Sequence, residues 1–268
     1  MRRASDAPCS PHLLDVSMFW GPTGGVRRVL TTKQVLFAKQ GWRDTVMAPG
    51  ATGHDRIDCG GLTLPASGGY RFVLRRAHAA RLIEELRPDL VEAADPYTLA
   101  WSVLDASRAL GIPAVAFCHS NLPALAARFA GGADGAQTRR ARWAARRAER
   151  YLADLYSRFD LVMAPSRSLQ QRLQDWGVPR VAHQPLGVDC SVFTPTAADP
   201  AWRWCLEQKL QLAPGTKLLV YSGRFAAEKN LQVLADAVEL LGPRHALVAI
   251  GSGPMPPRGP GVRLLPPE

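Results

Sequence analysis

The sequence lacks several features that would assign it to common classes of protein. Its 268 residues contain no run of 18 or more apolar residues, so a membrane-spanning helix is not expected. The basic residues at its start are not followed by an apolar run, which argues against a secretory signal. The five cysteines are far apart and include no C-x-x-C pair. This spacing argues against a disulfide framework and a structural zinc site, and it fits a reducing, cytoplasmic compartment.

Lysine is also scarce, since only 5 of the 33 basic residues are Lys and the other 28 are Arg. The formal net charge is +10. Part of that excess can reflect a GC-rich coding sequence rather than a function. A hydrophobic fraction of 47% and a charged fraction of 21% are typical of a folded globular chain rather than a disordered one.

Short apolar runs alternate with longer segments of helical period, which predicts an α/β fold with parallel sheets. Residues 50–69 are rich in Gly and are expected to be irregular, with a short strand at 62–64. The other strands expected in the first part of the chain are 12–19, 45–48, 90–93, 114–118, 161–164 and one near 181. Helices are expected at 26–40, 75–86 and 97–110, over a long segment ending near 159, and after Ser166 as the N-cap.

The segment 185–195 lacks period and holds Gly187 and two prolines, which predicts a connection between domains. The alternation then restarts, with strands at 217–221, 246–250 and 262–265 and helices at 201–210 and 230–241. We therefore expect one Rossmann-like domain over residues 1–190 and a second over residues 191–268. Three strands are few for a covered open sheet, so the second domain is expected to be incomplete.

The sharpest local signal is the segment 221–231, in which Arg224 and Lys229 lie between a predicted strand and a predicted helix. Ligands of open α/β sheets bind at this edge, and the amides of a helix N-terminus favour anions. Two fixed cations there suit a diphosphate. The alternative is a pair of solvated surface cations. Their position directly after a buried strand favours the ligand site.

A second signal is the Gly-rich turn 21–25 after the first predicted strand. Gly24 and Gly25 would let a ligand approach the backbone ahead of a helix, although simple turn chemistry explains the same pattern equally well. The turn does not have the form G-x-G-x-x-G. Asp44, the candidate ribose-binding acid, precedes its predicted strand instead of following it, so NAD binding is not expected.

Six short motifs follow one another along residues 12–265. They are Thr23-Gly-Gly-Val26, His119-Ser120, Ala164-Pro-Ser-Arg-Ser-Leu169, Pro185-Leu-Gly-Val-Asp189 with Phe193-Thr-Pro195, Ser222-Gly-Arg224 with Glu228-Lys-Asn230, and Gly251-Ser-Gly-Pro254. In this order and spacing they resemble the retaining family-4 glycosyltransferases of the two-domain GT-B fold. The stretches 92–97 and 118–123 are similar to mannosyltransferase-like members of that family.

The resemblance implies a hexosyltransferase that acts with retention of configuration. The donor would be a nucleotide diphosphate sugar, GDP- or UDP-hexose with mannose as one candidate sugar, and the acceptor would be a glycan or a lipid-linked molecule. Arg224 and Lys229 would hold the diphosphate and stabilise its charge as the sugar leaves, so no metal or other cofactor is expected. A covalent carboxylate is not expected either, because no acidic residue follows the strand at the matching N-domain site.

The same resemblance gives further residues a role. Gly24 and Gly25 would lie under the donor phosphates and sugar, and His119 would face the transferred sugar as a catalytic residue. Gly251 and Gly253 would let the nucleotide approach the chain. From the residues alone, a structural role explains His119 equally well, and turn formation explains the last two glycines.

One feature of the family is absent from the sequence, namely a later segment with two spaced glutamates that contacts the donor sugar and ribose. We therefore expect the chain to be a fragment that stops within the C-terminal domain. Two alternatives stay open, a non-catalytic nucleotide-binding remnant and a GT-B-like nucleotide-sugar epimerase. A phosphorylase would need a pyridoxal-binding Lys, and Lys is scarce here.

The segment 139–159 carries seven Arg against Glu149 and Asp154, half of the whole formal charge. Its apolar residues recur at helical spacing, which predicts an amphipathic helix with a basic face. That face would suit the anionic inner surface of the cytoplasmic membrane, and a solvated helix face is an equally good explanation. Nucleic-acid binding is not expected, because no recognition motif accompanies the charge. The candidate membrane-facing residues are Arg139, Arg142, Trp143, Arg146 and Arg150.

Overall fold

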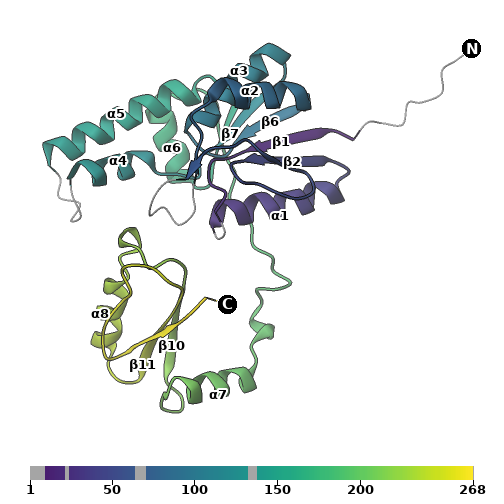
Figure 1. The fold of residues 1–268 in the computed structure, drawn as a ribbon. Helices are drawn as coiled ribbons and strands as arrows, with labels where there is room; N and C mark the ends of the chain where they lie inside the picture. Colours follow the sequence, from purple (N-terminus) through teal and green to yellow (C-terminus); the bar gives the residue numbers. More distant parts are fainter. Residues whose placement is uncertain (1–9, 22–23, 64–70, 132–137, 268) are drawn as a thin grey trace, which may run out of the picture. The chain divides into compact units, whose positions relative to one another are not determined.

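The computed structural model describes residues 10–21, 24–63, 71–131 and 138–267. They form two compact units, Met1–Gly187 and Val188–Glu268, each built around its own parallel sheet (Figure 1). Thr23 in the predicted Gly-rich turn lies outside the described residues. The α/β architecture with parallel sheets is confirmed.

The first unit has a seven-stranded sheet in the order β3-β2-β1-β6-β7-β8-β9, with every pair parallel. The strand order reverses at β1, since β2 and β3 lie on one side of it and β6 to β9 on the other. A separate antiparallel pair joins β4 (Leu62–Thr63) to β5 (Arg71–Phe72). The seven strands are β1 (His12–Val16), β2 (Arg43–Ala48), β3 (Arg56–Asp58), β6 (Leu90–Ala93), β7 (Ala114–Phe117), β8 (Leu161–Ala164) and β9 (Val181–His183).

Helices cover the two faces of this sheet unequally. Helix α1 (Gly25–Lys39) lies on one face, and α2 (Arg76–Leu86) and α3 (Thr98–Leu110) pack together on the other (Figure 1). Helix α3 has seven buried residues, whereas Leu30 is the single buried residue of α1. Hydrophobic packing therefore fixes α3 far more strongly than α1. The remaining helices of this unit are α4 (Leu122–Gly131), α5 (Arg139–Tyr156) and α6 (Arg167–Asp175).

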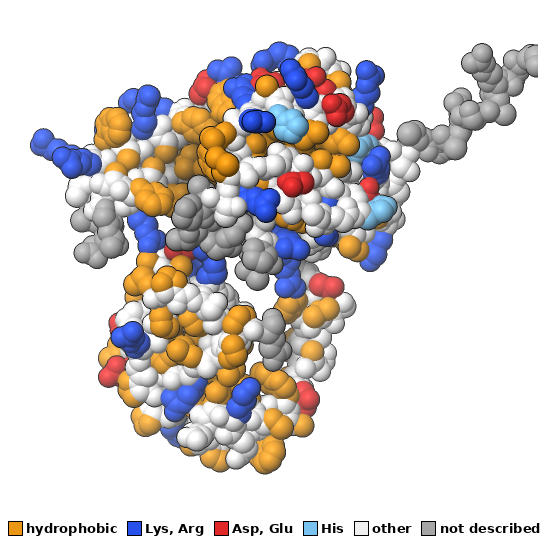
Figure 2. All heavy atoms as spheres, in the orientation of Figure 1, with side chains coloured by type: hydrophobic (Ala, Val, Ile, Leu, Met, Phe, Trp, Pro, Cys, Tyr) orange, Lys and Arg blue, Asp and Glu red, His pale blue; other side chains and the backbone are white. Residues whose placement is uncertain are grey.

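The second unit has three parallel strands in the order β10 (Lys217–Ser222), β11 (His245–Ile250) and β12 (Val262–Leu265). Two α-helices, α7 (Pro200–Lys209) and α8 (Gln232–Leu241), accompany them, with 3₁₀ turns η1 (Pro195–Ala197) and η2 (Ala227–Lys229). Hydrophobic side chains stay on its surface (Figure 2), so this small sheet is incompletely covered. Exposed examples are Trp202, Trp204, Val220, Leu240 and Leu264.

Most predicted elements are present, and the Ser166 cap is confirmed because its side chain accepts a hydrogen bond from the Leu169 amide. Several expectations were wrong. Strands β3 and β5 and helix α4 occur where no element was predicted. Strand β1 ends at Val16 rather than at residue 19, and Asp44 lies inside β2, where it is buried. Helix α8 begins two residues later than predicted, since η2 and the left-handed Asn230 precede it.

The packing of α1 against the sheet can be tested by replacing Leu30. Replacement of this fully buried side chain by Ala should lower the free energy of unfolding by about 2–5 kcal/mol, because it leaves a cavity under the helix. Leu36→Ala, on an exposed side of the same helix, should change it by no more than about 0.5 kcal/mol. Urea titration followed by circular dichroism measures both. Equal losses in the two variants would contradict the packing described here.

Candidate functional site

Three loops meet at the carboxyl edge of the first sheet, because strands β1, β6 and β7 are neighbours. The loop after β1 carries Gly24 and Gly25, the loop after β6 carries Asp95, and the loop after β7 carries His119. The reversal of strand order lies between the first two of these loops. Open α/β sheets bind ligands at such a point. The structure thus places Gly24, Gly25 and His119 at one edge of one sheet.

The loop after β1 ends at an exposed helix N-terminus. Gly24 has an extended backbone, and a Cβ atom built on Gly25 would meet no atom within 4 Å. The loop is held from behind by Trp20, whose ring lies 5.0 Å from the Arg27 guanidinium and 5.3 Å from that of Arg56. Arg27 also donates a hydrogen bond of 2.9 Å to the carbonyl of Gly21. The space in front of Gly25 and the first-turn amides of α1 suit an anion.

Asp95 ties the loops after β1 and β6 together. Its carboxylate accepts hydrogen bonds from the Met18 amide (2.5 Å), the Ser17 hydroxyl (3.1 Å) and the Tyr97 amide (3.4 Å). Burial raises the pKa of Asp95 to about 6 in spite of these donors. The sequence analysis gave this residue no role, although an acid followed by Pro after a buried strand was a usable signal. The carboxylate is enclosed, so it acts as a structural tie and not as a nucleophile.

His119 is an uncharged imidazole at neutral pH. Its ring stacks on Phe117 with centroids 4.1 Å apart, and its Nε2 atom is buried without a hydrogen-bond partner among the described residues. Burial, and secondly the positive charge of Lys33, lower the pKa of His119 to about 4. A neutral ring with one unused nitrogen can exchange a hydrogen bond with a ligand hydroxyl. It is a poor proton donor at neutral pH.

In the second unit, Arg224 and Lys229 lie between β10 and α8, the placement expected from sequence. The Arg224 side chain is 63% exposed and forms an ion pair of 2.9 Å with Glu228. Lys229 is exposed at the end of η2. The loop itself is fixed, because the Phe225 amide donates to the Ser252 carbonyl at 2.8 Å. Two exposed cations therefore stand on a rigid loop at the carboxyl edge of this sheet.

Gly251 and Gly253 have a structural role that the chain itself explains. Both have a positive φ, at 150° and 149°. A Cβ atom on Gly251 would lie 1.9 Å from the carbonyl oxygen of Gly223, and one on Gly253 would lie 2.3 Å from that of Phe225. The loops after β10 and β11 can approach this closely only with glycine at both positions. This close approach requires no ligand.

Helix α5 presents the predicted basic face. Arg139, Arg142, Arg146 and Arg150 are exposed, Trp143 is 68% exposed, and the opposite side buries apolar residues. Figure 2 shows basic side chains around the end of the first unit where α5 lies. In the described parts of the chain, no helix is both long and apolar enough to cross a membrane.

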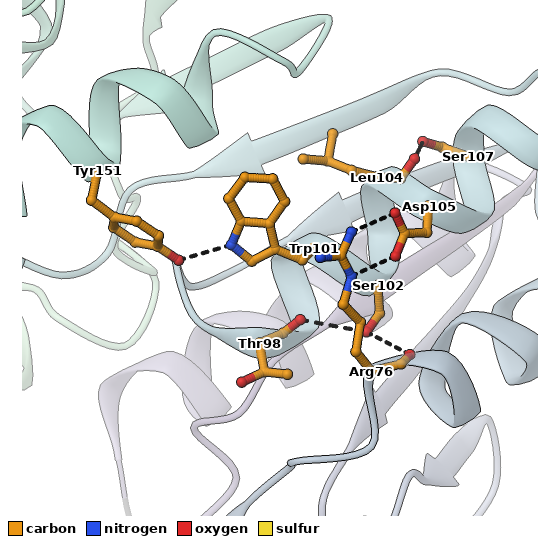
Figure 3. A network of polar contacts seen from close by, with 8 residues as sticks. All are labelled: Arg76, Thr98, Trp101, Ser102, Leu104, Asp105, Ser107 and Tyr151. Carbon is orange, nitrogen blue, oxygen red and sulfur yellow. Dashed lines mark hydrogen bonds and ion pairs between the residues drawn. The ribbon is translucent and has the colours of Figure 1, made fainter.

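Tyr151, on the same helix, faces inward instead. Its hydroxyl donates to the Pro96 carbonyl at 2.7 Å and accepts from Trp101 Nε1 at 3.0 Å, the second of which is drawn in Figure 3. Arg76 lies over the Trp101 ring and forms a two-pronged ion pair with Asp105. This network joins α5 to the loop that contains Asp95.

A buried charge cluster lies between α1 and the sheet, and the sequence analysis did not predict it. Lys33 Nζ contacts Asp15 Oδ1 at 2.6 Å and Glu92 Oε2 at 2.8 Å. Asp44 on β2 is buried and belongs to the same electrostatic group. Burial raises the pKa of Asp15 well above its usual value and that of Asp44 to about 6. The two partner carboxylates raise the pKa of Lys33.

Comparison with known proteins decides the family. Residues 23–192 match Glycosyltransferase Family 4, and this match covers more than half of the chain. The chain belongs to that family. The family and the GT-B fold expected from the six motifs are therefore confirmed.

Relatives of this family-4 chain include two GDP-mannose-dependent alpha-mannosyltransferases. The one from Mycolicibacterium smegmatis is 33% identical over 158 residues, which are 58% of this chain and 38% of the relative. The one from Mycobacterium tuberculosis is 31% identical over 178 residues, 65% of this chain and 42% of the relative. The matched segments thus span about two fifths of these relatives.

Solved structures show the same fold at low sequence identity. The Anabaena protein HepE in complex with UDP-glucose has a TM-score of 0.67 at 17% identity, covering 96% of this family-4 chain and 69% of HepE. A glycosyltransferase from Rickettsia africae has a TM-score of 0.64 at 15% identity, with 97% and 69% covered.

The buried acid Asp44 predicts a pH-dependent stability difference. A folded-state pKa near 6, above the ordinary 3.8, means that this carboxyl favours folding fully below pH 3.8 and loses that contribution as the pH rises through 6. Asp44→Asn should therefore stabilise the fold at pH 7.5, by at most about 3 kcal/mol, and give no gain at pH 4. Thermal unfolding at both pH values measures this. A constant difference, or the same profile in the surface control Asp154→Asn, would contradict it.

Proposed function

We propose that this protein transfers a hexose from a nucleotide diphosphate sugar to a glycan or lipid-linked acceptor, with retention of configuration. The observation that carries the proposal is the pair of exposed cations, Arg224 and Lys229, on a fixed loop between β10 and α8. Family membership supports it, and the mannosyltransferase relatives favour mannose and GDP. The neighbour that binds UDP-glucose keeps UDP as the second candidate nucleotide.

The donor's diphosphate would bind at the carboxyl edge of the second sheet, where Arg224 and Lys229 lie. Arg224 would leave its surface partner Glu228 and engage phosphate oxygens through two N–H groups, and Lys229 would add a point charge. Both cations stabilise the negative charge that builds up on the diphosphate as the bond to the sugar breaks. In the first unit, the amides at the start of α1, beside Gly24 and Gly25, are proposed as neutral hydrogen-bond donors to an anionic ligand group.

His119 would face the transferred sugar from the loop after β7, and a turn of its ring would bring the buried Nε2 to a sugar hydroxyl. Because its pKa is lowered to about 4, the ring stays neutral, and the departing diphosphate itself is the acceptor for the proton of the attacking hydroxyl. The attack would come from the face that the diphosphate leaves, which retains the configuration. Gly251 and Gly253 would line the nucleotide side of the site in addition to packing their own loops.

The basic face of α5 is the proposed membrane-binding surface, which would bring the protein to a lipid-linked acceptor. Arg139, Arg142, Arg146 and Arg150 are exposed next to the exposed ring of Trp143. Each cation near an anionic bilayer is worth about 1 kcal/mol, and an exposed Trp inserts at the interface. We propose that the protein works in the cytoplasm at the inner face of the cytoplasmic membrane, where a lipid-linked acceptor is held.

Two alternatives share the fold and are separated by product analysis. A nucleotide-binding protein without catalysis would bind GDP or UDP and release no sugar. An epimerase would change the sugar in the absence of any acceptor. Incubation of a labelled donor with and without a lipid acceptor distinguishes these outcomes from transfer.

Replacement of Arg224 tests the donor site. In a full-length version of the protein, Arg224→Ala should lower turnover about 10²–10³-fold, because a charge that stabilises the transition state is lost. The fold should be unaffected, since the side chain is exposed and its ion pair lies on the surface. Steady-state release of nucleotide from GDP-mannose measures the effect. Arg158→Ala, which removes a similar surface pair with Asp154, is the matched control, and equal turnover in both variants would sink the assignment.

Gly25→Ala separates ligand approach from turn chemistry. The methyl group would meet no protein atom, so thermal stability should be kept or slightly raised. If donor phosphates approach this backbone, the affinity for the donor should fall about tenfold or more, measured by calorimetry. Gly251→Ala should behave oppositely and unfold at lower temperature, because its methyl group collides with Gly223. Unchanged donor affinity in Gly25→Ala would remove this glycine from the site.

The membrane surface is tested by charge removal on α5. A triple replacement of Arg142, Arg146 and Arg150 by Gln should weaken binding to vesicles with 30% anionic lipid by roughly 100-fold, at about 1 kcal/mol per cation. Flotation or sedimentation assays measure it. Replacement of Arg81, Arg87 and Arg108, exposed on or next to α2 and α3, removes the same charge elsewhere. If both triple variants bind the vesicles equally, the net charge of the protein and not the basic face of α5 determines binding, which contradicts the proposal.

A further inference from the structure

Helix α1 is held on the sheet by one fully buried side chain and by several polar contacts. Leu30 is its single buried residue, whereas Lys33 and Gln34 reach the sheet with their polar ends. Gln34 Nε2 donates to the backbone carbonyls of Asp44 (3.0 Å) and Asp55 (3.2 Å). Lys33 is the only one of these that carries a charge. The position of α1 on the sheet therefore depends on a few directed interactions.

The Lys33 contacts join three elements at one point. Its ammonium group bridges Asp15 of β1 and Glu92 of β6, which are paired across the parallel ladder. These are the two strands between which the strand order reverses. The Asp15 side chain is fully buried, that of Glu92 is 9% exposed and that of Lys33 is 18% exposed. Water therefore screens these ion pairs weakly.

A gain in folding stability is a poor explanation for such a buried charge cluster. Desolvation of buried ions offsets much of their attraction, and apolar replacements of a buried ion pair are often neutral or stabilising. Here the cluster also includes Asp44, so acids outnumber the one cation. What buried ion pairs supply instead is a defined geometry, since their partners must meet at one position.

That geometry bears on the first turn of α1. Lys33 lies eight residues after Gly25, about 12 Å along the helix axis. A helix that pivots at Lys33 would displace its N-terminal amides relative to β1 and β6. We propose that Lys33 is a positioning residue, which sets the first-turn amides of α1 for the donor's phosphates by fixing the helix to the strands on both sides of the reversal. This inference rests on the proposed function, which supplies the ligand, and on the Lys33 contacts, which supply the geometry.

The decisive variant removes the charges together. Lys33→Met combined with Asp15→Asn and Glu92→Gln leaves no unpaired ion in this trio, so its melting temperature should stay within about 5 °C of the wild type. Hydrogen exchange of the amides from Arg28 to Gln34 should nevertheless become at least about tenfold faster, and affinity for GDP-mannose or UDP-glucose should fall about tenfold. Lys39→Met, at the exposed end of α1, should match the wild type throughout.

If the triple variant does not fold, two single variants test the proposal independently. Glu92→Gln keeps the Lys33–Asp15 pair and should accelerate the same exchange by a smaller factor, roughly threefold. Lys33→Met should raise the pKa of His119 in an NMR titration, because a positive charge near that ring is lost. Wild-type exchange rates in α1 of Glu92→Gln and of the triple variant would overturn the proposal. Wild-type donor affinity in a triple variant whose helix exchanges faster would overturn its functional half.

Failure of the proposed function gives a result that differs from failure of the Lys33 proposal. If the unaltered protein binds neither nucleotide sugar, the donor assignment falls, and the exchange rates still decide whether Lys33 seats the helix.

Discussion

The reversal of strand order at β1 is the constraint on which the first unit depends. Because the chain adds β2 and β3 on one side of β1 and β6 to β9 on the other, right-handed crossovers place α1 and the pair α2–α3 on opposite faces (Figure 1). The loops that leave β1 and β6 lie at this reversal, and Asp95 ties them together. A Cβ atom on Gly25, at the start of α1, would meet no atom within 4 Å. The candidate site therefore follows from topology before any side chain is considered.

Electrostatics acts in opposite ways in the two units. In the first unit the charged groups near the site are buried and paired, and their effect is indirect: Lys33 holds a helix, and its charge helps to keep His119 neutral. In the second unit Arg224 and Lys229 are exposed and available to a ligand. A diphosphate needs cations that can reach it, whereas a neutral sugar needs hydrogen-bond partners in fixed positions. The distribution of charge in this protein suits such a two-part ligand.

Sequence patterns predicted what depends on neighbours along the chain. The strands, the Ser166 cap, the basic face of α5 and the loop position of Arg224 were all visible as local patterns. Strand β3 has three residues within a Gly-rich stretch and gains its identity from pairing with β2, so no periodicity could show it. The Lys33 cluster joins residues 18 and 59 positions apart through the pairing of β1 with β6, so no local pattern could bring Lys33, Asp15 and Glu92 together. The enclosed geometry of Gly251 likewise required the fold.

The central claim is that the carboxyl edge of the second sheet, at Arg224 and Lys229, binds the diphosphate of a nucleotide sugar. A crystal structure of the protein with GDP-mannose or UDP-glucose tests it most directly. The account predicts that the phosphates lie within hydrogen-bond distance of the Arg224 guanidinium and the Lys229 ammonium, with the Glu228 ion pair opened. A nucleotide bound elsewhere on the protein, or one held at this edge without contact to either cation, would contradict it.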